Sequence, residues 1–144
     1  MRTLRSGLAR STARGQALVE FSLTIIIFLV LLMGVFDLGR GIYMFNGVSE
    51  AAREIARRTA VYPGVTLGQS TQTQAVVATQ RGLVPAFQTP DFLCVDITGN
   101  ANGKVPCQSG DYVRVTVTAT YSPVTLLGLS GPINLTSSSS IRIP

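Results

Sequence analysis

The chain has 144 residues, a formal net charge of +5 and no histidine. Without histidine it lacks the commonest general base and a frequent zinc ligand, so we expect no enzymatic activity, no cofactor and no metal. The positive charge does not indicate nucleic-acid binding, because four of the 12 basic residues lie within residues 1–15 and the others form no basic stripe interleaved with aromatic residues.

Residues 1–15 are basic and contain no acidic residue. They show no apolar periodicity, so we expect a flexible leader. Basic residues that flank an apolar segment favour the cytoplasmic side of a membrane. The sequence therefore predicts a cytoplasmic N-terminus.

The next segment is apolar, and Phe21 to Phe36 are 16 consecutive residues without a charge. A helix of about 20 residues, at about 1.5 Å per residue, spans a hydrocarbon core of about 30 Å. We therefore predict a transmembrane helix at residues 16–36. Glu20 is the only charged residue between Leu18 and Phe36. Such a carboxylate either has a partner in the membrane or lies shallow enough to reach the interface.

The pattern after Phe36 indicates that the helix continues through residues 37–60 as an exported amphipathic segment and ends at Pro63-Gly64. The predicted apolar stripe consists of Leu38, Ile42, Phe45, Val48, Ala52, Ile55 and Thr59. On the polar side, Glu54 is spaced to pair with Arg57 or Arg58. Four glycines of this helix indicate either a hinge or close helix contact, or are simply tolerated: Gly34, Gly39, Gly41 and Gly47.

Residues 61–144 are expected to form a small exported α+β domain. A capping box at residues 71–74 predicts a short helix that Gly82 closes. Alternation of apolar and polar residues then predicts strands at residues 92–97, 111–121 and 133–143, separated by loops at residues 99–103 and 126–132. The predicted fold class is α+β, with a long N-terminal helix packed against a small, mainly antiparallel three-stranded sheet.

The two cysteines, Cys94 and Cys107, both follow the membrane segment. Disulfides persist in exported compartments, and a bridge across so short a loop adds about 3 kcal/mol in the chain-entropy model. We expect a disulfide that stabilises the small sheet, and two free thiols are the alternative.

The position of a possible cleavage site distinguishes the apolar segment from an ordinary signal peptide. No small-x-small site follows it, whereas Gly15 and Gln16 precede it, with Glu20 and Phe21 close behind. This arrangement resembles a prepilin-peptidase site, at which cleavage removes the leader and retains the apolar helix.

The segment from Arg14 to Ala60 resembles the TadE-like pseudopilins of the tight-adherence (Flp) type IV pilus system. The matching residues are Gly15-Gln16-Ala17, Val19-Glu20-Phe21, Asp37-Leu38-Gly39-Arg40, Tyr43, Asn46 and Ala51 through Arg57. The resemblance implies a minor pseudopilin, because major Flp pilins are much shorter. It also implies a single-pass protein of the bacterial inner membrane whose C-terminal domain is exported. Such a protein either assists assembly from the membrane or is incorporated in the fibre.

The implied partners are a prepilin peptidase, other pilins and pseudopilins, the pilus assembly platform and membrane lipid. After cleavage, Glu20 would lie near the new ammonium group of Gln16. Pairing of these charges between subunits would fix their axial register. The alternative from another class is a membrane-anchored binding or adhesion module that acts independently of a pilus.

Overall fold

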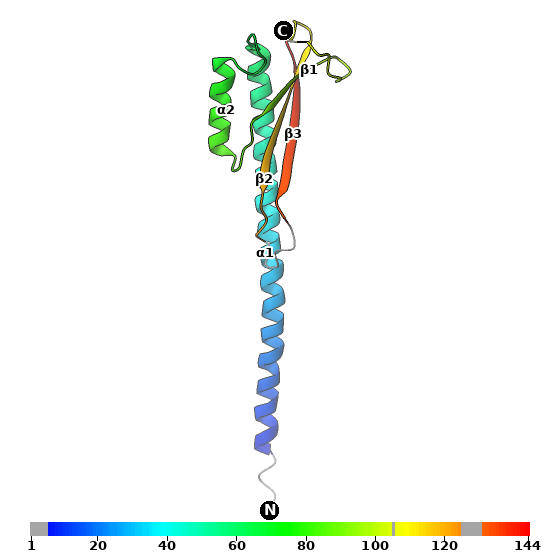
Figure 1. Cartoon of the computed structure of the whole chain (residues 1–144). Coiled ribbons are helices and arrows are strands. Elements are labelled where there is room, and N and C mark those ends of the chain that lie inside the picture. The colour runs from blue at the N-terminus through cyan, green and yellow to red at the C-terminus, as the bar shows by residue number, and fades with distance from the viewer. Residues whose placement is uncertain (1–5, 105, 125–130) are drawn as a thin grey trace, which may run out of the picture.

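The longest element is the helix α1, which runs from Ser6 to Val61 in the computed structural model (Figure 1). The structure describes residues 6–104, 106–124 and 131–144. The expectation of a flexible leader is wrong for residues 6–15, because α1 begins at Ser6 and not near Gln16. Alanine, leucine and arginine are good helix formers, and no proline interrupts this part of the chain. The remaining leader residues, 1–5, lie outside the described residues.

The half of α1 nearer the N-terminus stands apart from all other elements (Figure 1). Among the described residues, α1 is the one helix long and apolar enough to cross a membrane, and none of its most apolar window is buried within the chain. Its large apolar side chains are exposed from Leu18 through Phe36, apart from Ile25, which is half-buried. This half of α1 thus has the length and the exposed apolar surface of a membrane anchor.

The other half of α1 forms one wall of the core. Four residues of the predicted stripe are buried as expected: Val48, Ala52, Ile55 and Thr59. The three preceding members are exposed, which corrects the prediction: Leu38, Ile42 and Phe45. The core also takes in residues outside the stripe, namely Met44, Ala51, Ala56 and Ala60. The buried surface is wider than one stripe because α1 packs against both the sheet and a second helix.

That second helix, α2, runs from Thr71 to Leu83. Its cap is Ser70 and not Thr71, because the Ser70 hydroxyl accepts a hydrogen bond from the backbone N–H of Thr73 at 3.2 Å. Gly82 lies inside the last turn and does not close the helix. Val77 and the C-cap residue Val84 join the core with α1.

Three antiparallel strands form the sheet in the order β1-β2-β3: β1 (Asp91–Val95), β2 (Tyr112–Tyr121) and β3 (Ile133–Arg142). In β2 every second residue is buried, as predicted: Val113, Val115, Val117, Ala119 and Tyr121. The strand β1 ends before the predicted Ile97, because the Asp96 carboxylate accepts hydrogen bonds from the backbone N–H groups of Thr98 and Asn100 and so builds a turn. The predicted α+β fold class is confirmed.

The two long strands lie along the C-terminal half of α1 (Figure 1). β3 presents small polar residues to the helix, and the Ser137 and Ser49 hydroxyls are 3.0 Å apart. Of the loop expected at residues 126–132, residues 126–130 lie outside the described residues.

The ion pair expected on the polar side of α1 is not formed. Over the described ranges, the ion pairs are Asp37–Arg40 and Lys104–Asp111, so Glu54 pairs with neither Arg57 nor Arg58. Exposed ion pairs contribute little to the free energy of folding, so these side chains are not held in one paired geometry.

Candidate functional site

The residues of the predicted cleavage site lie on one uninterrupted helix. Gly15, Gln16, Glu20 and Phe21 are all exposed, and the peptide bond between Gly15 and Gln16 lies inside α1. The Gln16 side-chain amide donates to Glu20 Oε1 at 3.1 Å. The structure therefore brings together the two residues predicted to interact after cleavage, one helical turn apart on the same face.

Glu20 differs from the other polar residues at this end of the apolar segment. Ser22 donates its hydroxyl proton to the Leu18 carbonyl at 2.7 Å, and Thr24 donates to the Glu20 carbonyl at 2.8 Å. These hydroxyls are satisfied by the helix itself, so they add little cost in lipid. The Glu20 carboxylate carries a charge that one amide donor does not neutralise. It is the group in this segment with the greatest need of a further partner.

A second cluster lies where α1 leaves the apolar segment. We call Asp37, Arg40 and Tyr121 the exit cluster. The Tyr121 hydroxyl lies 2.8 Å from the Asp37 carbonyl oxygen and 3.1 Å from Asp37 Oδ1, and it donates to these acceptors. Arg40 Nη1 lies 3.3 Å from the same Oδ1. The exit cluster therefore ties the end of β2 to the first charged turn beyond the apolar segment.

The environment of Tyr121 keeps its hydroxyl protonated. Burial, together with the hydrogen bond to Asp37, raises the pKa of Tyr121 above its ordinary value. The Arg40 guanidinium lies 5.9 Å from the centre of the Tyr121 ring, within the range of a cation–π contact. Tyr121 thus acts as a neutral donor, packed on one side by a cation.

Sequence reasoning missed the role of Tyr121, although two signals existed. Tyr121 is the last inward-facing residue of β2, and a buried tyrosine hydroxyl needs a hydrogen-bond partner. Asp37 is the first charged residue after the apolar run. What the sequence lacks is the contact itself, which joins residues far apart in the chain.

Beside the exit cluster lies an apolar groove of about 490 Å³, which we call the exit groove. α1 contributes Gly34, Asp37, Leu38, Gly41, Ile42 and Phe45, and the sheet end contributes Tyr121, Pro123, Ile133 and Leu135. The three stripe residues that were expected to be buried, and are exposed, all line this groove. The sheet comes close to them and leaves them uncovered.

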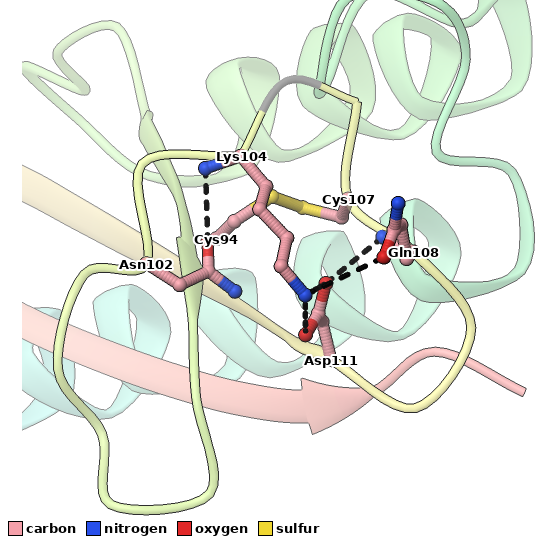
Figure 2. Close-up of a disulfide and its surroundings, with 6 residues drawn as sticks. All are labelled: Cys94, Asn102, Lys104, Cys107, Gln108 and Asp111. Atoms are coloured by element: carbon pink, nitrogen blue, oxygen red, sulfur yellow. Dashed lines mark hydrogen bonds and ion pairs between the residues drawn. A yellow bond between two sulfur atoms is a disulfide. The ribbon is translucent and has the colours of Figure 1, made fainter.

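At the opposite end of the sheet, Cys94 and Cys107 form the expected disulfide (Figure 2). Beside it, Lys104 Nζ lies 3.0 Å from Asp111 Oδ1, and the Gln108 backbone N–H donates to Asp111 Oδ2 at 3.0 Å. The Gln108 hydrogen bond, followed by the contact with Lys104, lowers the pKa of Asp111. The described part of this loop is held together by the disulfide, the ion pair and the hydrogen bonds to Asp111. Within the described ranges, no three cysteine or carboxylate side chains gather as metal ligands would.

Comparison with known families finds a match to a model described as TadE-like protein, over residues 15–57. The matched segment contains the predicted cleavage site and the helical part of the exit cluster, whereas Tyr121 and both cysteines lie outside it. Neither the comparison with curated proteins nor that with solved structures gives a match. The family match confirms the resemblance found in the sequence and associates the chain with tight-adherence pilus systems, in which TadE-like proteins are structural components.

Proposed function

We propose that the chain is a minor pseudopilin that assists assembly of a tight-adherence (Flp) type IV pilus. The observation that carries the proposal is the construction of α1. A single helix holds a prepilin-type site, an exposed apolar segment with Glu20, and a packed exported half, and its residues 15–57 match the TadE-like family. Its partners would be a prepilin peptidase, other pilins and pseudopilins, and the assembly platform.

The proposed processing step is cleavage between Gly15 and Gln16. Glycine at this position destabilises the helix by about 1 kcal/mol relative to alanine, which favours local opening of the backbone for a peptidase. Intact-mass spectrometry of protein extracted from membranes of cells with the cognate peptidase should show a chain that begins at Gln16. A chain that retains residues 1–15 would contradict the proposal.

A matched pair of glycine variants sharpens this test, because neither Gly15 nor Gly34 has a neighbouring atom where a Cβ would stand. Gly15→Leu should block cleavage. Gly34→Leu, which changes the same helix at a site where a Cβ likewise meets no atom within 4 Å, should be cleaved normally. Equal processing of both variants would mean that Gly15 is not read by the peptidase.

The proposed topology is a single pass through the bacterial inner membrane, with the N-terminus in the cytoplasm and the sheet exported. The basic residues before the apolar segment support this orientation. So does the disulfide, because such bonds persist in oxidising compartments outside the cytoplasm.

The proposed role of Glu20 is to set the axial register between subunits. In the uncut chain its partner is the Gln16 amide, which is neutral. After cleavage, the Gln16 backbone nitrogen becomes an ammonium group, and an unpaired charge in an apolar helix bundle is costly. A carboxylate on one subunit that meets the amine of another would offset this cost at a single axial position, while apolar contacts would permit several.

Glu20→Gln tests this role, since the substitution keeps the size of the side chain and removes its charge. The variant should insert in the membrane, undergo cleavage, and fail to crosslink with partner pilins. Glu50→Gln, an exposed carboxylate on the exported half of α1, is the control and should behave as the unaltered chain does. Normal pilus number in a correctly cleaved Glu20→Gln strain would leave Glu20 as an interfacial residue.

Gene deletion distinguishes the proposed function from an independent adhesion module. Loss of the pseudopilin should abolish piliation. An adhesion module that acts alone would leave the fibres intact and remove only attachment.

A further inference from the structure

Charge is distributed unevenly along the long axis of the exported domain. The sequence has no charged residue between Arg114 and Arg142, a stretch that covers most of β2 and β3. These two residues are neighbours at the end of the sheet that holds the disulfide, where Arg114 Nε donates to Ser140 and Tyr112 pairs with Arg142. The opposite end, where β2 finishes and β3 begins, has no charge of its own.

This uncharged end lies at the level where α1 leaves the apolar segment. Beyond a hydrocarbon core of about 30 Å, each headgroup layer adds about 5–7 Å. With Phe36 at the boundary of the core, that layer covers about four residues of helix at about 1.5 Å per residue, which are Asp37 to Arg40. Tyr121 donates to Asp37, so the end of β2 lies in the same layer.

Large apolar side chains are exposed at this end of the sheet. Val124, beyond the end of β2, is 64% exposed, and Ile133, the first residue of β3, is 48% exposed. Ile133 lines the exit groove, and Val124 follows Pro123, which also lines it. The α1 side of this groove includes apolar residues that the sheet leaves uncovered. Tyr43, also exposed, lies on α1 one turn beyond Arg40, and tyrosine is typical of the membrane interface.

We propose that the β2–β3 end of the sheet rests in the headgroup layer of the exported leaflet, so that the domain contacts lipid at a second place besides α1. Continuity with the apolar segment, the lack of charge and the exposed Val124 and Ile133 all favour lipid as the occupant. Exposed apolar groups leave water on entering this layer, and the sheet end has no charged group of its own that must be desolvated with them. The inference rests on the membrane anchoring proposed above and is independent of cleavage and of any pilus.

The chain offers a clean optical test because it has no tryptophan. Ile133→Trp places a single fluorophore at the proposed contact. Ile97→Trp, where the isoleucine is 85% exposed in the loop after β1 at the far end of the domain, is the matched control. Each variant is reconstituted at one chain per nanodisc, with lipids that carry bromine on the acyl chain near the headgroup or with unbrominated lipids.

Ile133→Trp should show blue-shifted emission and lose fluorescence in brominated discs, whereas Ile97→Trp should emit as in water and be unaffected. Retention of the disulfide and of the circular dichroism spectrum establishes that each variant is folded. If Ile133→Trp does not fold, Val124→Trp is read in the same way.

Two results would overturn the proposal. In one, the folded tryptophan at position 133 or 124 is unquenched at one chain per disc. In the other, it becomes shielded only when several chains share a disc, which would assign this surface to a second copy of the chain. In both cases the chain remains in the disc, so the anchoring stands; failure of the chain to enter discs would instead defeat the anchoring itself, together with the contact that rests on it.

Discussion

The two halves of α1 are one continuous helix with opposite relations to the rest of the chain. Ile27, in the half nearer the N-terminus, is 62% exposed, whereas Ile55 in the C-terminal half is 0% exposed. The first half carries no charged residue from Phe21 to Phe36, and the second carries polar residues on the side that faces solvent. The first half thus has the uncovered apolar surface of a membrane anchor, whereas the chain itself covers the second half.

The largest effect on the free energy of unfolding should come from truncating an isoleucine in the C-terminal half of α1, compared with the same truncation in the half nearer the N-terminus. Ile55→Ala leaves a cavity between α1 and the sheet and should lower the free energy of unfolding by about 2–5 kcal/mol. Ile27→Ala should leave it unchanged. Denaturant unfolding of the chain in detergent, followed by circular dichroism, measures both variants. Equal losses would show that the two halves are not energetically distinct.

The next effect concerns the end of the domain farthest from the apolar segment. Loss of the Cys94–Cys107 bridge in Cys94→Ala should lower the free energy of unfolding by about 3 kcal/mol in the chain-entropy model. Reduction of the unaltered chain should add the mass of two hydrogens, and the variant should show no such change. Free alkylation of both thiols in oxidised, folded protein would contradict the prediction.

A smaller effect is expected at the boundary between the halves. Tyr121→Phe removes the hydrogen bond to Asp37 and retains the ring, so the free energy of unfolding should fall by about 1 kcal/mol. Amide exchange at the end of β2 should accelerate. Tyr43→Phe is the control, because the Tyr43 side chain is exposed and loss of its hydroxyl should not change the free energy of unfolding. Unaltered exchange in Tyr121→Phe would mean that the exit cluster does not hold the sheet end.

The smallest effect is a pH dependence at the end that holds the disulfide. The folded-state pKa of Asp111 lies below 3.8, the ordinary value, because its carboxylate accepts from Gln108 and meets Lys104. Its contribution to stability is therefore complete above that value and is lost as the pH falls through the lowered pKa. Thermal unfolding should show this acid-induced loss, reduced in Asp111→Asn. Part of it should remain, because the hydrogen bond from Thr98 lowers the pKa of Asp96 in the same direction.

The sequence predicted those features that repeat along the chain. Alternation from Val113 to Tyr121 identified β2 and its buried face, and the spacing of Val48, Ala52 and Ile55 identified the packed side of α1. Such periods follow directly from strand and helix geometry. The order β1-β2-β3 also agrees with the expectation that strands adjacent in sequence pair in space.

Features that depend on contacts between distant segments were not predictable in this way. The apolar stripe includes Leu38, Ile42 and Phe45 at the same helical spacing, yet the sheet leaves these three side chains uncovered. The contact of Tyr121 with Asp37 likewise depends on where β2 stops along α1, and no local pattern encodes that position. The importance of Glu20 was readable because a lone charge in an apolar segment is unusual. Its role in assembly stays a prediction.

The continuity of α1 has a geometric consequence for any neighbour in the membrane. Leu38 follows Glu20 by 18 positions, which at 3.6 residues per turn is about five complete turns. The two residues therefore lie on nearly the same side of the helix. α1 runs without a break through Gly34, so the side of the helix that carries Glu20 is also the side that carries Leu38 and the exit groove. A neighbouring helix that contacts Glu20 would therefore approach α1 on the side of the exit groove. The orientation of the sheet relative to that neighbour would then be set before the two sheet domains touch.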